Sequence, residues 1–517
     1  MVPNPIFVHG GSIMHITSNT RYLKIPVNNT SASSKIRIFG DEQLLIDLDT
    51  CFDKSAHSVM YYDLAPFMGR DITVTHDSGH AFEFCANIPD APAEAFRPKV
   101  HFTAPYGWIN DPNGLVYYRG VYHLFYQHNP AGTKWGNMHW GHALSRDLVH
   151  FEHLNEALFP DELGDMFSGS AMVDEENLLG LNTPEHKAIL LFYTAAGGHR
   201  EINREAKFTQ CLAYSLDGGH TFQKYAKNPI VPHIKAQNRD PKVVYDEEND
   251  VYLMALYLDG AEYALLTSND LISWQQLQTF ELPGDDECPD IYKMDNGKGE
   301  RKWVICGAHD RYTVCDFDPS AGFVNMTEPR TLGFGSVYAA QSYSGTARRI
   351  RYSWNRFTAV PSKYFNCELS VPCELRLFGN ELRIAPAREL ERAYIFSETI
   401  ENLPSHGISM EVGRSFDITL ELSRLEEAVI IMLCGNEIKL DPMSGVVTVN
   451  SECTMPLCPT NDKARVRLIA DNYGIELFTG IEDGYAKAFG AFPCEITGDM
   501  LIMRGEGSLD KLVINKF

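Results

Sequence analysis

The chain has 517 residues, of which 44% are apolar and 22% charged, a composition typical of a folded globular protein rather than a disordered or fibrous one. At roughly 100–200 residues per domain, this length predicts about three domains. The formal net charge of −23 opposes binding to nucleic acid and to anionic membranes, so we expect neither as a partner.

The sequence shows no segment typical of export or membrane insertion. Residues 1–10 lack a basic stretch followed by an apolar one, and nowhere do 18 apolar residues run together. The 12 cysteines are scattered and include no Cys-x-x-Cys pair, which predicts neither a zinc ribbon nor a disulfide scaffold. We therefore expect a cytoplasmic protein with reduced thiols. The oligomeric state stays open, a homo-oligomer included.

Residues 1–98 are predicted to form a small N-terminal β domain. Short runs rich in Val, Ile, Tyr, Phe and Thr alternate there with turn-forming residues, which is typical of β-strands. The Pro- and Ala-rich segment 87–95 closes this region and is interpreted as a linker.

Residues 99–395 repeat one pattern, an acidic residue beside a proline followed by two strands. The pattern begins at Asn110-Asp111-Pro112, returns at Arg239-Asp240-Pro241 and occurs inverted at Glu287-Cys288-Pro289-Asp290. It indicates that this part of the chain is built from several copies of one strand-rich unit.

A second repeated element gives the length of the unit. A Ser-x-Asp turn that leads to an aromatic residue recurs with Asp147, Asp217 and Asp270, at intervals of 70 and 53 residues. Such a spacing suits a blade of four strands, and about five units fit between residues 99 and 395. The sequence therefore predicts a five-bladed β-propeller.

Residues 396–517 are predicted to form a C-terminal β-sandwich. Alternating runs such as 416–422 and 466–469 are typical of strands with one buried face. Together the three regions predict an all-β protein with a small N-terminal β domain, a propeller and a sandwich.

Three carboxylates hold the same place in the repeat. The first strand of each propeller blade lines a central channel, so residues that open these strands converge at one end of it. Asp111, Asp240 and Glu287 all occupy this position, although 129 and 47 residues separate them along the chain. Carboxylates that converge without a metal-binding motif indicate glycoside chemistry, in which one attacks the sugar and a carboxylic acid protonates the leaving oxygen.

The sequence neighbours of each carboxylate suggest its role. Asp111 lies among amide side chains that favour its ionised form, which suits a nucleophile. Glu287 lies in the acidic stretch 285–290, whose negative charge favours a protonated acid. Arg239 precedes Asp240 and favours its ionised form, which suits the stabilisation of positive charge.

Each motif taken alone has a simpler interpretation. Asn-Asp-Pro-Asn-Gly consists of turn-forming residues, and an isolated copy is more often a turn than an active site. His139, His142 and His150 resemble metal ligands, but histidines in a strand-rich segment are more often packed or hydrogen-bonded. The motifs occur together in one phase of a repeat, which favours an active site without a metal or cofactor.

The sequence resembles glycoside hydrolase family 32, which includes invertases, levanases and inulinases. The resemblance covers about residues 98–517, and its motifs occur here in the family's order. They are Trp108-Ile109-Asn110-Asp111-Pro112-Asn113-Gly114, Phe125-Tyr126-Gln127, Trp135-Gly136-Asn137-Met138-His139-Trp140-Gly141-His142, Phe167-Ser168-Gly169-Ser170, Arg239-Asp240-Pro241 and Glu287-Cys288-Pro289-Asp290.

The resemblance implies a retaining, exo-acting β-fructofuranosidase with a five-bladed propeller and a C-terminal sandwich. It implies Asp111 as the nucleophile, Glu287 as the general acid/base and Asp240 as the stabiliser of the transition state. It further implies a fructosyl subsite lined by Asn110, Gln127, Trp135, Phe167, Ser168 and Arg239. The substrates would be small carbohydrates such as sucrose and fructo-oligosaccharides, with levan and inulin as further candidates.

Two positions depart from the family pattern. Asp286 stands where many members carry an aromatic residue, and Cys373 stands where the family usually has arginine. The N-terminal segment 61–74 resembles the small β domain of levanase-like members, whereas the expected cytoplasmic location favours short substrates. A fructosyltransferase and a catalytically silent sugar-binding propeller stay open as alternatives.

Overall fold

The computed structural model describes residues 12–56, 58–404, 407–460, 463–505 and 508–517. The expectation about export concerns residues 1–10, which lie outside these ranges. The described chain is built from β-strands, with two short 3₁₀ helices, η1 (Ala65–Phe67) and η2 (Arg388–Ala393), which confirms the all-β prediction. Among the described residues, no helix is long and apolar enough to span a membrane.

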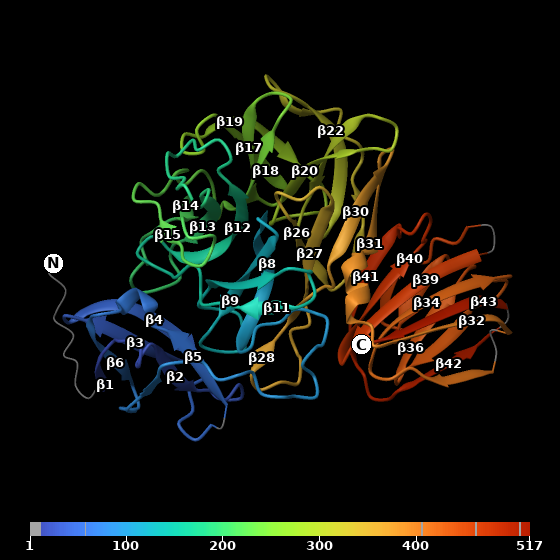
Figure 1. Ribbon diagram of the computed structural model, residues 1–517, viewed down its shortest axis with the longest axis horizontal. Helices are drawn as coiled ribbons and strands as arrows, with labels where there is room; N and C mark the ends of the chain where they lie inside the picture. Colours follow the sequence, from blue (N-terminus) through green and yellow to red (C-terminus); the bar gives the residue numbers. More distant parts are fainter. Residues whose placement is uncertain (1–11, 57, 405–406, 461–462, 506–507) are drawn as a thin grey trace.

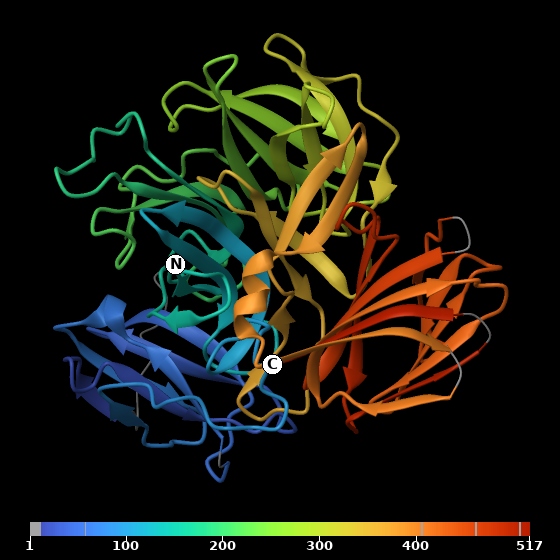
Figure 2. The ribbon, with the colours of Figure 1, turned by 45° about the vertical axis from the view of Figure 1, so that its right-hand side comes forward.

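The N-terminal region forms two antiparallel sheets, of which one is four-stranded and the other three-stranded. In spatial order the strands are β1 (Ser12–His15), β6 (Asp71–His76), β3 (Ser34–Gly40) and β4 (Gln43–Thr50), and then β5 (Val59–Asp63), β2 (Tyr22–Pro26) and β7 (Glu83–Cys85). Both sheets contribute to one core, which includes Ile25, Ile38, Leu48, Tyr62 and Val74. These sheets lie beside the central part of the molecule, opposite the C-terminal sheets (Figures 1 and 2).

Five successive sheets follow between residues 107 and 386. The first contains β8 (Gly107–Tyr118), β9 (Val121–Asn129), β10 (His139–Ser145), β11 (Phe151–His153) and β28 (Phe365–Asn366). The second contains β12 (Asp165–Val173), β13 (Ile189–Ala196), β14 (Thr209–Ser215) and β15 (Gln223–Lys224). The third contains β16 (Arg239–Asp246), β17 (Val251–Asp259), β18 (Glu262–Ser268) and β19 (Gln275–Glu281).

The last two of these sheets have the same antiparallel arrangement. One contains β20 (Asp290–Asp295), β21 (Arg301–Cys306), β22 (Arg311–Asp318), β23 (Gly322–Val324) and β24 (Arg330–Thr331). The other contains β26 (Val337–Ser342), β27 (Arg349–Asn355), β29 (Glu368–Leu369), β30 (Cys373–Phe378) and β31 (Glu381–Pro386). The repeat predicted from the sequence thus corresponds to consecutive sheets of similar topology.

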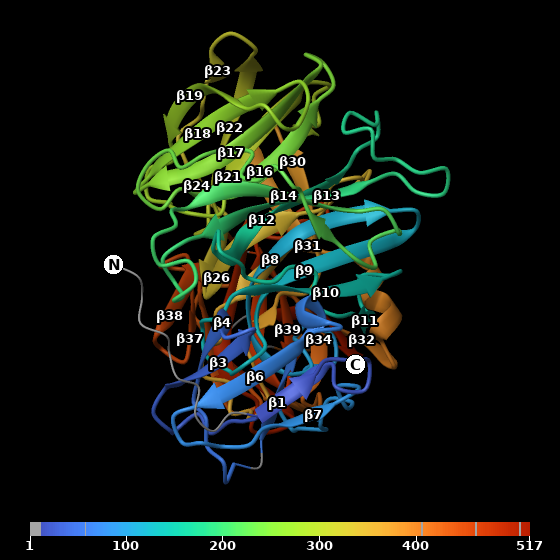
Figure 3. The ribbon, with the colours of Figure 1, turned by 90° about the vertical axis from the view of Figure 1, so that its left-hand side faces the viewer.

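The first strands of these sheets contact one another in a closed ring. β8 contacts β12, β12 contacts β16, β16 contacts β20, β20 contacts β26, and β26 returns to β8. Figure 3 shows β8, β12 and β16 following one another through the middle of the molecule. Residues that open these strands are therefore brought to a common centre.

The Ser-x-Asp turns have the predicted geometry. Asp147 Oδ1 accepts the backbone N–H groups of Val149 at 3.1 Å and His150 at 2.9 Å, immediately before β11. Asp217 and Asp270 accept backbone N–H groups in the same way. Because these short side chains accept the backbone N–H groups of the turn, the chain reverses tightly before the outer strand of the sheet begins.

The C-terminal region contains a seven-stranded and a six-stranded sheet that share one apolar core, to which Phe416, Val466, Ile431 and Val447 belong. The seven-stranded sheet consists of β25 (Gly333–Gly335), β41 (Ala488–Glu495), β40 (Tyr473–Thr479), β39 (Lys463–Asp471), β34 (Ser415–Ser423), β43 (Ser508–Lys516) and β32 (Phe396–Pro404). The six-stranded sheet consists of β33 (Ile408–Glu411), β42 (Met500–Arg504), β35 (Val429–Leu433), β36 (Asn436–Asp441), β37 (Val446–Val449) and β38 (Cys453–Pro456).

A buried ionic cluster joins the C-terminal sheets to the start of the central region. The His101 ring lies 3.4 Å from Asp471 Oδ2 and 3.3 Å from Glu476 Oε1, and its side chain is 2% exposed. Glu368 interacts electrostatically with the same groups. Burial lowers the pKa of His101, but attraction to Glu368, Glu476 and Asp471 outweighs it, so this pKa lies well above its ordinary value.

The cluster predicts that folding stability falls as the pH rises. Burial, together with repulsion by Asp471 and Glu476, raises the pKa of Glu368 from 4.5 to about 8. Between these values the folded chain holds a proton that the unfolded chain has released, and His101 acts in the same direction above pH 6.5. We expect urea denaturation midpoints to fall between pH 5 and pH 8, and Glu368→Gln to reduce this slope. An unchanged slope in Glu368→Gln would contradict the assignment.

Candidate active site

All nine residues predicted for the site line one cavity of about 320 Å³. β8 supplies Asn110 and Asp111, β12 supplies Phe167 and Ser168, and β16 opens with Arg239 and Asp240. Glu287 precedes β20, Gln127 lies in β9, and Trp135 lies in the connection from β9 to β10. Because the first strands form a closed ring, side chains far apart in the sequence meet at its centre.

Asp111 sits in an irregular part of β8. The register of the β8–β9 pair shifts between Ile109 and Pro112, next to a proline that cannot donate to the ladder. Asp111 Oδ2 accepts from Ser168 Oγ at 2.6 Å, and Oδ1 accepts from Asn110 Nδ2 at 3.2 Å. Burial raises the pKa of Asp111, while these two donors oppose the increase.

Only one of the amides expected around Asp111 bonds to it. Asn113, with its amide oxygen facing Gln127, accepts from Gln127 Nε2 at 2.9 Å and donates to Ser168 Oγ at 3.3 Å. Asn113 thus acts on Asp111 through Ser168. The Ser168 hydroxyl makes the shorter of the two hydrogen bonds to the Asp111 carboxylate. The side chain of Ser168 is what connects the two polar groups.

Asp240 adopts a left-handed backbone conformation, with φ of +65°, at the start of β16. Its backbone N–H donates to Thr194 Oγ1 at 2.9 Å, and its Oδ2 accepts from the backbone N–H of Cys288 at 3.1 Å. The expectation that Arg239 keeps Asp240 ionised needs correction. Burial raises the pKa of Asp240 to about 7 and outweighs the opposing effect of Arg239.

Glu287 is held by two donors at the mouth of the cavity. Its Oε1 accepts from Arg239 Nη2, and its Oε2 accepts from Tyr338 Oη at 2.9 Å. The backbone here is left-handed, with φ of +45° at Glu287 and +36° at Cys288. Tyr263 Oη donates to the Glu287 carbonyl at 3.1 Å and stabilises this turn.

Of the acidic neighbours of Glu287 in the sequence, Asp286 shares the Tyr338 hydroxyl with it, at 3.4 Å, whereas Asp285 and Asp290 bond elsewhere. Asp285 turns toward the loop after β21, where it accepts the backbone N–H groups of His309 and Arg311 at 2.8 and 2.9 Å. Asp290 lies 2.8 Å from Lys242 Nζ. The environment predicted for Glu287 from sequence proximity is therefore wrong for these two residues, because each bonds to groups from another strand or loop.

Cys288 connects two of the three carboxylates. Its buried thiol lies 3.4 Å from Asp111 Oδ2 and 3.5 Å from Asp240 Oδ2. Burial, together with repulsion by the two aspartates, raises its pKa well above the ordinary thiol value. The thiol therefore remains protonated and serves as a donor between Asp111 and Asp240.

Two of the aromatic side chains that line the cavity, Trp135 and Phe167, lie against each other. The ring of Trp135 is 52% exposed and meets the ring of Phe167 edge to face, with centroids 6.0 Å apart. His199 lies 5.1 Å from Phe167 and 6.1 Å from Trp135, between centroids. Such rings offer flat apolar faces to a ligand whose hydroxyls are bound by the carboxylates.

Five lining residues escaped prediction from the sequence: Met138, His199, Gln237, Tyr338 and Trp354. Tyr338 and Trp354 lie in β26 and β27, where no acidic residue beside a proline marks the repeat. Gln237 stands two residues before Arg239, and Met138 lies inside the motif of residues 135–142. Their closeness to these motifs could have indicated that both residues line the site. For His199 we find no signal in the sequence.

The N-terminal sheet supports the loop that carries Trp135. Asn137 Nδ2 donates to the Asp49 carbonyl at 2.7 Å, and Asn137 Oδ1 accepts the Asp49 N–H at 3.0 Å. Thr50 Oγ1 donates to the Ala131 carbonyl at 2.8 Å. β4 therefore holds this loop at two points on either side of Trp135.

The histidines considered as metal ligands are engaged otherwise. His139 Nδ1 lies 2.6 Å from the Asn137 carbonyl, His142 stacks on Phe125 with centroids 4.1 Å apart, and His150 bonds to Asp147 at 2.9 Å. Burial lowers the pKa of both His139 and His142 well below the usual value. Within the described ranges, no group of three His, Cys, Asp or Glu side chains is placed to hold a metal ion.

A cavity that gathers three carboxylates, an arginine and an aromatic border has the groups that glycoside hydrolysis uses. Residues 101–386 match the glycosyl hydrolases family 32 N-terminal domain, and the chain belongs to this family. The match confirms the resemblance drawn from the motifs.

Known relatives are similar over different shares of the chain. A levanase of Bacillus subtilis is 34% identical over 74% of this chain and 65% of its own length. An invertase of Schizosaccharomyces pombe is 40% identical over 53% of this chain and 52% of its own length. The chain thus spans between about half and two thirds of these two relatives. An exo-inulinase of Aspergillus niger is 32% identical, with 66% of this chain and 75% of the relative covered.

Solved structures agree with the fold. An exo-inulinase from Aspergillus awamori superposes with a TM-score of 0.71 at 23% identity, over 82% of this chain and 98% of that one. A β-fructofuranosidase of Bombyx mori reaches a TM-score of 0.65 at 25% identity, over 82% of this chain and 94% of that one. Both matches extend well beyond the cavity to most of the chain.

Proposed function

We propose that this chain is a retaining, exo-acting β-fructofuranosidase that hydrolyses terminal non-reducing β-D-fructofuranosides. The observation that carries the proposal is the meeting of Asp111, Asp240 and Glu287 in one cavity of a family 32 member. The relatives named levanase, invertase and exo-inulinase support fructosides as the substrate class. Sucrose and fructo-oligosaccharides are the first candidates, followed by levan and inulin.

In the proposed mechanism, Glu287 donates its proton to the glycosidic oxygen while an Asp111 oxygen attacks C2 of the fructosyl unit. The bond from C2 to the leaving sugar breaks, and a fructosyl-enzyme bond forms. Water then attacks C2 and gives its proton to Glu287, which releases Asp111 and yields fructose with retained configuration. No cofactor takes part in these steps.

The surrounding residues suit this sequence of steps. Arg239 contacts Glu287 and lies 3.7 Å from Asp240, so it can orient both acids. Ser168 donates to Asp111 and aligns the attacking carboxylate. We assign Asp240 to stabilising the positive charge that develops on the sugar, together with binding of its hydroxyls. Asn110, Gln127, Trp135 and Phe167 complete the fructosyl subsite.

The size of the cavity supports an exo-acting enzyme. A volume of about 320 Å³ lies at the small end of ligand pockets, which span about 300–1,000 Å³. Such a cavity suits one terminal sugar unit better than the middle of a polysaccharide.

For the architecture, we infer a five-bladed propeller over residues 99–395, an N-terminal β domain over 1–98 and a C-terminal β-sandwich over 396–517. The closed ring of β8, β12, β16, β20 and β26 supports the propeller, since first strands of blades line a common channel. The shared core of the two C-terminal sheets supports the sandwich.

The proposal is tested by separating the products formed from sucrose, 1-kestose, inulin and levan, with Glu287→Gln as the control. Free fructose from the wild type, and at least about 100-fold less from the variant in the same time, is the expected result. Longer oligosaccharides in place of fructose at high sucrose would instead indicate a fructosyltransferase. No product from any substrate, with the fold intact, would reject catalysis and favour a sugar-binding protein.

The pKa of Asp240 predicts the acidic limb of the pH profile. Burial raises this pKa to about 7, so the carboxylate is ionised above that pH and loses its charge as the pH falls. If Asp240 stabilises positive charge, kcat/KM for sucrose should decline below about pH 7. Sucrose has no group that titrates in this range, so the limb reports the enzyme. A profile that stays flat down to pH 5 would contradict this role of Asp240.

A further inference from the structure

Tyr338 links Glu287 to a second carboxylate. Its hydroxyl oxygen lies 2.9 Å from Glu287 Oε2 and 3.4 Å from Asp286 Oδ1, so the carboxylates of two adjacent residues face one phenol. A phenol has a single hydrogen to donate, and its oxygen can also accept. The hydroxyl can therefore donate fully to only one carboxylate at a time, and the shorter distance favours Glu287 in this structure.

The phenol of Tyr338 stays protonated, and its ring is held in place. Burial, together with repulsion by Cys288 and by both carboxylates, raises the pKa of Tyr338 well above its ordinary value. The guanidinium carbon of Arg356 lies 4.4 Å from the centroid of the ring, and the His309 ring meets it edge to face with centroids 4.9 Å apart. Tyr338 therefore keeps its hydrogen while the direction of its O–H bond can change.

Asp286 is oriented by the turn between β21 and β22. His309 Nε2 lies 3.3 Å from Asp286 Oδ1, the same oxygen that faces Tyr338. The backbone N–H of Ala308 donates to the Asp286 carbonyl at 3.0 Å. Asp285 fixes this turn, because its carboxylate accepts the backbone N–H of His309 at 2.8 Å. The carboxylate of Asp286 is thus held toward the phenol from the side opposite the protein chain that carries it.

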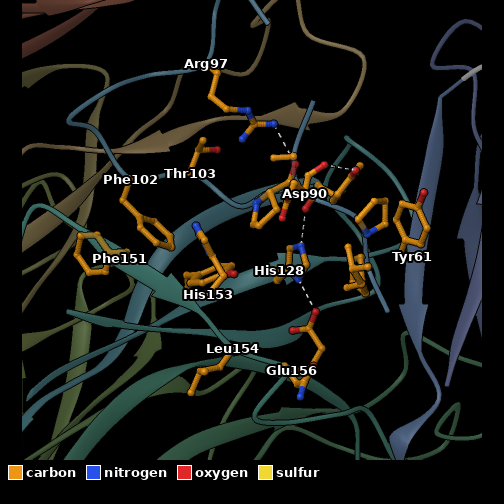
Figure 4. A pocket seen from close by; sticks show the side chains of 18 of the residues that line it. Tyr61, Asp90, Arg97, Phe102, Thr103, His128, Phe151, His153, Leu154 and Glu156 are labelled. Atoms are coloured by element: carbon orange, nitrogen blue, oxygen red, sulfur yellow. Dashed lines mark hydrogen bonds and ion pairs between the residues drawn. The ribbon is translucent and has the colours of Figure 1, made fainter. Parts of the chain in front are cut away.

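Asp286 and His309 lie outside the catalytic cavity. Its lining includes Glu287 and Tyr338 but neither of these two residues. The larger cavity of about 610 Å³ beside residues 87–91, which Figure 4 shows, is lined by none of the four. Asp286 therefore acts on the reaction through Tyr338 rather than by contact with the sugar.

We propose that Asp286 is a positioning residue for the acid/base step, which draws the hydrogen bond of Tyr338 away from Glu287 whenever Glu287 carries its proton. The inference rests on the proposed function. When Glu287 is ionised, Tyr338 donates to Glu287 Oε2. When Glu287 is protonated, the O–H bond of Tyr338 turns and donates to Asp286 Oδ1. The hydrogen stays on Tyr338 Oη throughout, so both protonation states of Glu287 have a suitable neighbour.

Without a second acceptor, the surroundings of Glu287 would favour only its ionised form. Arg239 Nη2 donates to Glu287 Oε1, and a second fixed donor at Oε2 would further oppose protonation. General acid catalysis needs the proton on Glu287 when the substrate binds. Asp286 stands where many family members carry an aromatic residue, which would offer Tyr338 no carboxylate. The alternation therefore depends on this chain's own residue.

Further charged or titratable groups face Glu287, Tyr338 and Asp286 from several elements. They are Asp111 of β8, Arg239 and Asp240 of β16, Tyr257 of β17, Tyr263 of β18, Asp285 and Cys288 beside Glu287, His309 of the β21–β22 turn and Arg356 after β27. All of them remain in every variant compared below, so differences between these variants report Asp286 and Tyr338.

The test compares the pH dependence of kcat/KM for sucrose in the wild type and in Asp286→Ala. The basic limb reports loss of the proton from the general acid. In Asp286→Ala, Tyr338 donates to Glu287 alone, so this limb should move to lower pH by about 0.5–1 unit, the shift expected from one hydrogen bond. Asp259→Ala, the matched control, removes the same charge from an exposed position that also interacts with Tyr257, and should leave the limb in place. An unchanged limb in Asp286→Ala, or an equal shift in the control, would overturn the proposal.

Tyr338→Phe separates the hydrogen bond from the charge of Asp286. That charge alone also disfavours an ionised Glu287, so its removal shifts the limb in the same direction. In Tyr338→Phe the effect of charge persists but the alternation is lost. Adding Asp286→Ala to Tyr338→Phe should therefore shift the limb by less than about half as much as in the wild-type background. Equal shifts in the two backgrounds would reject the proposal.

β-Fructosyl fluoride shows whether the shift belongs to the general acid. Its leaving group needs little protonation, so Asp286→Ala should not shift the pH dependence of kcat/KM for this substrate. A shift as large as that seen with sucrose would overturn the proposal. If the wild type hydrolyses no fructoside, the proposed function fails and the inference with it. Hydrolysis of sucrose with a basic limb that Asp286→Ala leaves unchanged rejects the inference alone.

Discussion

Asp111→Asn is expected to reduce fructoside hydrolysis by more than about 10⁴-fold, as the loss of a nucleophile does in enzymes that form covalent intermediates. The amide matches the carboxylate in size and can still bond to Ser168 and Asn110, so the fold should persist. Glu287→Gln should lose about 10²–10⁴-fold, the usual contribution of a general acid. Initial rates with sucrose and thermal unfolding of each variant measure both effects.

Azide separates the two roles. With β-fructosyl fluoride, whose leaving group needs little protonation, Glu287→Gln should still form the fructosyl-enzyme but react slowly with water. Azide attacks C2 without a general base, so it should restore turnover and yield β-fructosyl azide with retained configuration. In Asp111→Asn, azide can only take the place of the missing carboxylate, so any azide product should be the inverted α-fructosyl azide. A retained azide from Asp111→Asn, or an inverted azide from Glu287→Gln, would contradict the assignment.

Arg200→Met is expected to lower both stability and activity. The Arg200 guanidinium is 3% exposed and binds both oxygens of the buried Asp165, at 2.5 and 3.1 Å, and it also donates to the Asp47 carbonyl of β4. Removing one partner leaves a buried, uncompensated charge, which costs about 3–5 kcal/mol. Asp165 opens β12 two residues before Phe167, and His199 precedes Arg200, so the cavity should lose its shape and KM for sucrose should rise.

Arg37→Met provides the matched control for Arg200→Met. Arg37 also reaches from the N-terminal sheets to the turn after β13, where it pairs with Glu201 at 3.0 Å, but both side chains are partly exposed. A pair of this kind contributes about 0–1 kcal/mol. Urea denaturation and sucrose kinetics should therefore show a large loss in Arg200→Met and a small one in Arg37→Met. Equal effects of the two substitutions would contradict a specific role for Arg200.

Much of the site could be predicted from the sequence because of repeat phase. Asp111, Asp240 and Glu287 each stand where a repeated unit begins, and units of one topology bring their beginnings to a common centre. The fifth sheet has no such motif, so Tyr338 and Trp354 were missed, although Tyr338 donates directly to Glu287. Tyr338 belongs to no repeated motif, and only its position in the folded chain brings its hydroxyl to Glu287.

The protonation environments could not be predicted because they depend on contacts between sheets. Asp285 and Asp290 are close to Glu287 along the chain, yet they bond to the loop after β21 and to Lys242 of β16. Burial raises the pKa of Asp240 more than the adjacent Arg239 lowers it. The extent of burial cannot be inferred from the type of a single residue. Sequence proximity was therefore a poor guide to electrostatics in this site.

By itself, the sequence determined the all-β class, the repeated unit and the nine residues that line one cavity. These features follow from local patterns, namely alternation along strands, turn chemistry and recurrence at a regular interval. Only the tertiary structure decided which groups bond to each acid and how β4 and Arg200 support the border of the site. Such features arise where segments from different sheets meet, and their contacts depend on side-chain direction and burial in three dimensions.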